Sequence, residues 1–143
     1  MRFQTLVTNR FVKGEDLNHH GTLFAGRAAE WFVESGLMAV SMFLPAENIV
    51  CVKLHGMTFT RPIRLGEIAR FEATPVYAGR SSIFTYICAK VGEEKLIEGF
   101  ISYVNVDENG KAQPHGIVIE AESEEEKQLQ ERAMNLPHRH VPT

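Results

Sequence analysis

The chain has 143 residues, of which 44% are hydrophobic and 23% charged, and its formal net charge is −3. This composition is typical of one globular domain and excludes an intrinsically disordered chain. The longest apolar stretch, Leu37–Leu44, is far shorter than the ~20 residues of a membrane span, so no membrane partner is expected. No Lys/Arg cluster is present to bind a nucleic-acid backbone.

Two observations bear on the compartment. The first residues lack the long apolar run of a signal peptide. The two cysteines, Cys51 and Cys88, both lie in β-like apolar segments. We therefore expect reduced thiols and a cytoplasmic protein.

The first half of the chain predicts one strand and one long helix. Phe3–Val12 has β-like parity, and the polar segment Lys13–Gly21 reads as a loop. Leu23–Leu44 is free of proline, rich in helix-forming residues and apolar almost all round, which predicts a buried helix. Thr22 is placed to cap its first turn.

Short connections between β-like segments predict an antiparallel meander. The expected strands are Asn48–Thr60, Glu67–Tyr77, Ser81–Val91 and Lys95–Asp107. Both parities of Ser81–Val91 carry bulky side chains, so this strand needs cover on both faces. We expect the long helix on one face and a partner chain on the other.

The last segment is Glu-rich. Ala121–Asn135 predicts a peripheral helix that docks through Leu129, Ala133 and Met134, and Pro137–Thr143 reads as a loose tail. We therefore predict a single α+β domain over residues 1–143, with residues 120–143 at its periphery.

The segment from Asp16 to Gly26, which runs into the long helix, has the composition of a reaction site. A helix N-terminus offers unsatisfied N–H groups to an oxyanion, and small residues let a carbonyl approach the backbone. Glu30 and Glu34 lie further along the same helix and could activate water. The plainer alternative is a solvated helix edge with an Arg27–Glu30 ion pair.

Other chemistry is not indicated. The chain has no phosphate-binding P-loop, dinucleotide-binding glycine motif or Gly-x-Ser-x-Gly motif. His115, His138 and His140 fit no metal-ligand spacing, so we expect neither a metal site nor a cofactor.

Four segments together resemble hotdog-fold acyl-CoA thioesterases of the YciA and cytosolic acyl-CoA hydrolase type. Asp16-x-Asn18-x-x-Gly21-x-x-Phe24-Ala25-Gly26 is similar to the Asp-x-Asn-x-x-Gly-x-x-Phe-Gly-Gly signature of this family. The resemblance continues, in order and over residues 5–112, through three more segments: Met57–Glu67, Val76–Ser82 and Phe100–Lys111.

The resemblance implies a long helix wrapped by an antiparallel sheet, and hydrolysis of acyl-CoA to a free acid and CoA in lipid metabolism. It implies an active site shared between the chains of a homodimer, alone or within a dimer of dimers or trimer of dimers. The oxyanion and substrate residues would be Gly21, Phe24, Ala25 and Gly26. Asn18 would hold the thioester carbonyl or the water, and the CoA arm would lie along Gly79, Arg80, Ser81 and Ser82.

The sequence departs from the family at one position. The usual catalytic carboxylate falls at Val33, and Glu34 follows it. A small distortion of the helix would bring Glu34 to the expected place. We take Glu34 as general base or nucleophile and Asn18 as its partner. Glu30 and Asp16 stand as alternative carboxylates.

His20, beside the oxyanion loop, is a further catalytic candidate, and an exposed loop histidine is the alternative interpretation. A catalytic histidine belongs to hotdog hydratases, whose pattern requires histidine where this chain has Gly21. An enoyl-CoA hydratase or dehydratase is therefore the alternative enzyme. A non-catalytic acyl-CoA sensor is the alternative without catalysis, because Val33 is not acidic.

Overall fold

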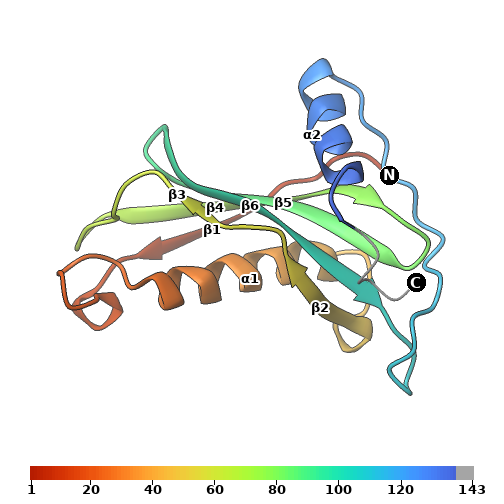
Figure 1. The fold of residues 1–143 in the computed structure, drawn as a ribbon, viewed down its shortest axis with the longest axis horizontal. Helices are drawn as coiled ribbons and strands as arrows, with labels where there is room; N and C mark the ends of the chain where they lie inside the picture. Colours follow the sequence, from red (N-terminus) through yellow and green to blue (C-terminus); the bar gives the residue numbers. More distant parts are fainter. Residues whose placement is uncertain (138–143) are drawn as a thin grey trace.

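The computed structural model describes residues 1–137. The sheet has the strand order β1-β4-β5-β6-β2, with β3 pairing β6, and all these pairings are antiparallel. The strands are β1 (Leu6–Phe11), β2 (Ile49–Leu54), β3 (Thr58–Phe59), β4 (Ile68–Ala78), β5 (Ser82–Val91) and β6 (Glu94–Asn105). Helix α1 (Ala25–Ser41) lies along one face of the sheet, and α2 (Glu124–Met134) stands on the other (Figure 1). The predicted α+β class and hotdog arrangement are confirmed.

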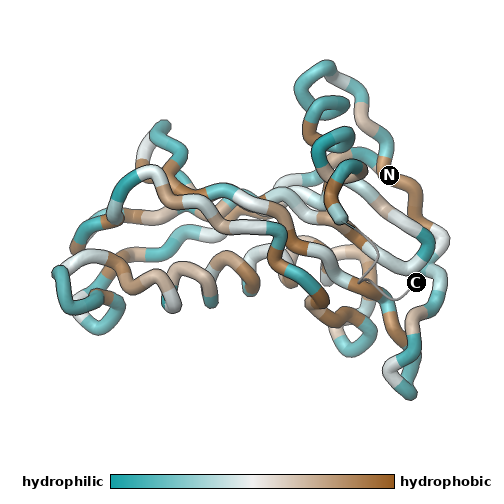
Figure 2. The backbone as a smooth tube through the Cα atoms, viewed as in Figure 1, coloured by the Kyte–Doolittle hydropathy of each residue, from teal (hydrophilic) through white to brown (hydrophobic). Residues whose placement is uncertain are grey.

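Helix α1 is apolar along most of its length, whereas α2 is mainly hydrophilic (Figure 2). The main core lies between α1 and the sheet and is centred on Phe32, Phe71, Ile87 and Tyr103, all of them buried. Burial of such side chains is the chief source of stability in a domain of this size.

The predicted long helix is confirmed, but its first residue is set by a contact that the sequence does not reveal. It begins at Ala25 because the N–H of Leu23 donates to the carbonyl of Ile63 at 2.8 Å, which keeps this segment extended. The expected Thr22 cap is wrong, since Phe24 is the N-cap and no side chain caps the helix. At the other end, Met42 and Phe43 form turns and the chain leaves the helix before Pro45.

The long strand expected over Asn48–Thr60 is broken into β2 and β3. Gly56 lies in the break with φ of +102°, a conformation that favours glycine. A Cβ on Gly99 would collide with the Gly56 carbonyl, so two glycines meet where the strand bends over β6. The other strands are confirmed with ends shifted by a few residues, β1 most of all.

The outer face of β5 is covered by this chain and not by a partner. Phe84, Tyr86 and Cys88 pack with Ala133 of α2 and with partly buried Leu129 and Phe3. The expectation of a partner chain over this face is therefore wrong for this part of β5. Met134, expected to dock, is 50% exposed. Beyond Pro137, the expected loose tail lies outside the described residues.

Gly36 sets how closely α1 approaches the sheet. A Cβ at this position would overlap the hydroxyl of Tyr103 and touch Ile87. We expect Gly36→Ala to lower the free energy of unfolding by about 1–3 kcal/mol, as overpacking does in cores. Gly14→Ala is the control, because nothing lies within 4 Å of its Cβ. Equal urea midpoints for Gly36→Ala and the wild type would show that the helix tolerates the shift.

Candidate active site

The loop before α1 is anchored by Asp16, which is buried with 4% exposure. Its Oδ2 accepts from the N–H of Lys13 at 2.9 Å, and its Oδ1 lies 3.2 Å from Nε of Arg27 in α1. The carbonyl of Asp16 accepts from the N–H of Phe24 at 2.9 Å. Asp16 therefore ties the loop to the first turn of α1, and its geometry favours a structural role over that of a base.

Asn18 shapes the turn around Gly21. Its Oδ1 accepts from the N–H groups of His20 at 2.9 Å and Thr22 at 3.1 Å, and its Nδ2 lies 3.2 Å from Oγ1 of Thr22. Gly21 takes φ of +78°, which this turn requires. The Asn18 oxygen is thus committed to the loop, and the amide hydrogen not used toward Thr22 is the group suited to a substrate oxygen.

The N-terminus of α1 presents backbone donors that have no partner in the described part of the chain. The first intrahelical bond runs from the N–H of Ala28 to the carbonyl of Phe24 at 3.0 Å. The N–H groups of Ala25, Gly26 and Arg27 precede it and have no partner within the helix. Ala25 and Gly26 are exposed, and no side chain caps the helix. The helix dipole adds partial positive charge here, so a developing oxyanion would be stabilised.

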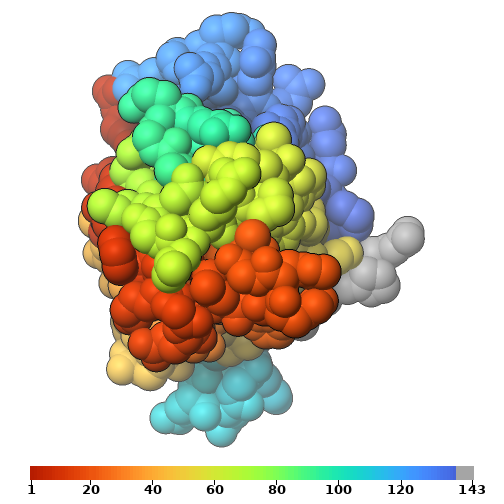
Figure 3. All heavy atoms as spheres, turned by 90° about the vertical axis from the view of Figure 1, so that its left-hand side faces the viewer, coloured from red at the N-terminus to blue at the C-terminus, as the bar shows by residue number. Residues whose placement is uncertain are grey.

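This loop lies at one end of the molecule, beside the segment that connects β3 to β4 (Figure 3). Thr22 and Arg64 form an isolated bridge between the two segments. Phe24 and Leu65 are 55% and 59% exposed.

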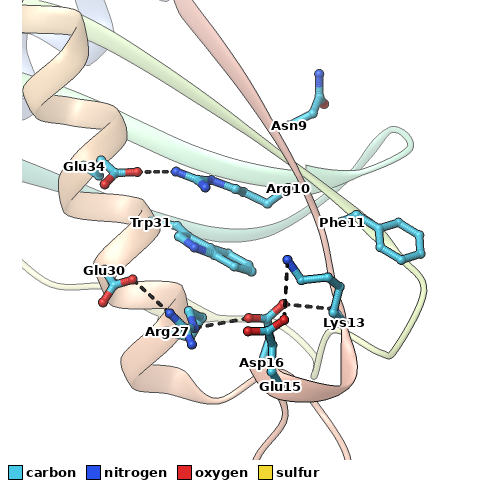
Figure 4. Close-up of a pocket in the computed structure, with 10 residues that line it drawn as sticks. All are labelled: Asn9, Arg10, Phe11, Lys13, Glu15, Asp16, Arg27, Glu30, Trp31 and Glu34. Atoms are coloured by element: carbon cyan, nitrogen blue, oxygen red, sulfur yellow. Dashed lines mark hydrogen bonds and ion pairs between the residues drawn. The ribbon is translucent and has the colours of Figure 1, made fainter.

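A cavity of about 390 Å³ opens between β1, this loop and α1 (Figure 4). Both candidate helix carboxylates lie on it. Its lining is mostly charged and comprises Asn9, Arg10, Phe11, Lys13, Glu15, Asp16, Arg27, Glu30, Trp31 and Glu34.

Each helix carboxylate has its own arginine. Glu30 lies 3.2 Å from Nη1 of Arg27, as the plainer interpretation of this stripe predicted. Glu34 pairs with Nη2 of Arg10 from β1. The Glu34 side chain is 49% exposed, so water reaches this carboxylate.

The helix distortion expected around Val33 is absent, because α1 is an uninterrupted α-helix from Ala25 to Ser41. Consecutive helix residues point about 100° apart, so Glu34 does not occupy the direction of Val33. Glu34 turns toward β1, where it pairs with Arg10. A carboxylate at position 34 therefore points away from a different side of the helix than a carboxylate at position 33 would.

The rings of His19 and His20 lie 3.9 Å apart on the exposed turn, as the alternative interpretation of an exposed loop histidine predicted. Burial raises the pKa of the Cys88 thiol, so this cysteine is not an activated nucleophile.

The Gly79–Ser82 turn lies at the opposite end of the sheet from the loop. Ser81 and Ser82 are 0% and 4% exposed, and their carbonyls accept from Asn105 and Gly79 at 2.7 and 3.0 Å. Arg80 is exposed. The two serines therefore build the turn, and Arg80 is the side chain of this turn that a ligand can reach.

Sequence reasoning missed Arg10 and Trp31. Inward and outward positions alternate along β1, and Arg10 occupies an inward one, between exposed Asn9 and Phe11. An arginine at an inward strand position needs a partner, which was the available signal. That the partner is Glu34 depends on how α1 lies against β1.

The chain belongs to the thioesterase superfamily, whose family model matches residues 20–98. This region contains the end of the loop, α1 and strands β2 to β5, with part of β6. The acyl-CoA thioester hydrolase YciA of Salmonella typhimurium is 30% identical over 121 residues, which cover 76% of this chain and 88% of that protein.

Two solved structures extend the likeness. An apo-hexameric acyl-CoA thioesterase superposes with a TM-score of 0.82 at 26% identity, covering 91% of this chain and 86% of its own. An acyl-CoA hydrolase from Staphylococcus aureus, in complex with butyryl coenzyme A, coenzyme A and coenzyme A disulfide, gives 0.80 at 25% identity. That match covers 91% of this chain and 79% of the hydrolase.

Proposed function

We propose that this protein is an acyl-CoA thioesterase, which converts acyl-CoA and water to a carboxylic acid and CoA. The observation that carries the proposal is the match to the thioesterase superfamily from the end of the loop through α1 and most of the sheet, together with the likeness to YciA over most of its length. A free-thiol assay with a panel of acyl-CoAs tests it directly. Release of CoA is the expected result, and no release from any acyl-CoA would refute it.

In the proposed reaction, the thioester oxygen lies against the N–H groups of Ala25 and Gly26. Glu34 accepts a proton from water as the oxygen of that water adds to the carbonyl carbon. The negative charge that develops on the thioester oxygen is stabilised by the helix N-terminus. When the C–S bond breaks, the proton on Glu34 passes to the sulfur, and acid and CoA leave.

These groups are widely spaced within one chain. Ala25 and Glu34 are nine residues apart on a regular helix, a rise of about 13 Å, which exceeds the size of a thioester group. Arg80 lies further still, because the 11 residues of β4 extend over about 33 Å between the two ends of the sheet. The separation supports a homo-oligomer in which one chain supplies the oxyanion donors and its partner supplies Glu34 and Arg80.

An edge of the sheet supports the same conclusion. Strand β2 pairs with β6 on one side, and its sequence is Ile-Val-Cys-Val-Lys-Leu. Val50 and Leu54 are 43% and 42% exposed. An apolar edge strand is a template for pairing with another chain. The comparison structure with a TM-score of 0.82 is hexameric, which is consistent with a dimer as the building block of a larger assembly.

Among residues 1–137, no helix is long and apolar enough to cross a membrane. We place the protein in the cytoplasm and its reaction in lipid metabolism. Two free thiols support a reducing compartment.

An acyl-CoA-binding sensor is the second candidate, favoured by Val33 and by the Glu34 carboxylate being held by an arginine. The assay that tests hydrolysis separates the two. A sensor binds CoA esters tightly and releases no thiol, whereas the thioesterase turns over.

Arg80 provides a test of substrate binding. We expect Arg80→Ala to raise KM for acyl-CoA by about tenfold with kcat little changed, because a charge-assisted contact to phosphate is lost. The effect should shrink for acyl-pantetheine, which lacks the nucleotide. Lys111→Ala removes another exposed cation of the chain and is the matched control. Equal losses with both substrates would mean that Arg80 has a structural role.

A further inference from the structure

The Arg10 side chain links β1 to the helix face that carries Glu34 (Figure 4). Its Nη2 pairs with Oε1 of Glu34, and its Cζ lies 5.5 Å from the centre of the Trp31 ring. Trp31 is 7% exposed and packs edge-on against Phe71 of β4 at 6.2 Å. The guanidinium is thus held between a carboxylate and a ring that is itself fixed in the core.

A second feature indicates that this position is constrained. The Nε atom of Arg10 is buried and has no hydrogen-bond partner among residues 1–137. Leaving a buried donor unpaired is unfavourable, and an arginine free to move would turn this group to water. The contact with the Trp31 ring and the ion pair with Glu34 therefore offset the unfavourable free energy of the unpaired Nε and keep the side chain in this position.

The other charged groups on this face have different partners. Arg27, which precedes Glu34 by seven residues, lies 3.2 Å from both Asp16 and Glu30. Lys13 lies 3.8 Å from Glu15. Arg10 is therefore the cation that pairs with Glu34, and it approaches from another element.

We propose that Arg10 is a positioning residue that holds the Glu34 carboxylate in one orientation for catalysis. The inference rests on the proposed function, in which Glu34 is the base. A half-exposed glutamate samples several rotamers, and misplacement of a reacting group lowers kcat steeply. Arg10 acts on the substrate only through Glu34, and Trp31 keeps Arg10 in place.

The test is a double-mutant cycle on the full chain, with Arg10→Gln, Glu34→Gln and the double variant. We expect Arg10→Gln to lower kcat by about tenfold and to leave KM within about twofold. Arg10→Lys, which keeps the charge, should recover most of this loss. When Glu34 is already replaced by Gln, adding Arg10→Gln should not lower kcat further. Arg2→Gln, which breaks the remote surface pair with Glu122, is the control and should match the wild type.

The outcomes separate the inference from the function on which it rests. If the wild type releases no CoA from any substrate, the proposed function fails. If the wild type is active and Glu34→Gln remains as active, Glu34 is not the base and Arg10 has no positioning role. If Glu34→Gln is inactive but Arg10→Gln has normal kcat, or Arg10→Lys is no better than Arg10→Gln, the positioning role alone is overturned. Thermal unfolding of each variant identifies losses that come from misfolding.

Discussion

Glu34→Gln is expected to lower kcat by at least ~100-fold, the low end for loss of a general base, with KM little changed. Glutamine keeps the size and a hydrogen-bonding oxygen but cannot take a proton from water. The side chain is 49% exposed in the single chain, so the substitution leaves no buried cavity and folding should be intact. Steady-state kinetics with the best acyl-CoA substrate measures the effect.

Glu30→Gln is the matched control on the same helix. Glu30 is paired with Arg27, whose guanidinium also lies beside buried Asp16, so Glu30 belongs to the anchor of the loop. Glu30→Gln should therefore lower kcat much less than Glu34→Gln does. Asn18→Ala should fall between the two, because it removes one amide and loosens the turn that Asn18 organises. A dead Glu30→Gln beside an active Glu34→Gln would place the base one turn earlier.

The sequence predicts those elements whose character is set by the composition of one continuous segment. The apolar density of Leu23–Leu44 predicts α1, and the bulk on both sides of Ser81–Val91 predicts a strand buried on both faces. The sequence did not show that α2 is the element covering the outer face of β5. The apolar contacts that the Glu-rich α2 makes with Phe84, Tyr86 and Cys88 come from Leu129 and Ala133, which are a weak signal in a polar segment. Another α2 side chain on this face, Arg132 over the Tyr86 ring, is charged and does not predict docking.

The site was predictable in its residues and less so in its geometry. The helix N-terminus and Asn18 follow from a continuous segment of sequence. Arg10 could not be assigned to Glu34 because 24 residues separate them and only the packing of α1 against β1 brings them together. The helix distortion expected at Val33 was wrong for a related reason. Glu34 points toward its partner Arg10 on β1, and a regular α1 already places it there.

Ala25→Pro is expected to lower kcat by about 10²–10³, the usual cost of one oxyanion donor. Ala25 is the first residue of α1, where proline is well tolerated because its missing N–H has no partner within the helix. Phe24 has φ of −65° and ψ of 129°, which suits a residue before proline. The change therefore removes one donor and leaves the helix intact. Glu124→Pro, at the corresponding position of α2, is the control and should be fully active.

Co-expression of Ala25→Pro with Glu34→Gln then tests whether the site is shared between chains. In a mixed dimer, one site contains both defects and the other contains neither, because donor and base come from different chains. Random mixing makes half the dimers mixed, so activity should recover to about a quarter of wild type from two nearly inactive variants. If donor and base belonged to the same chain, every site in the mixture would carry one defect. Activity that stays at the level of the separate variants would therefore rule out a site built across two chains.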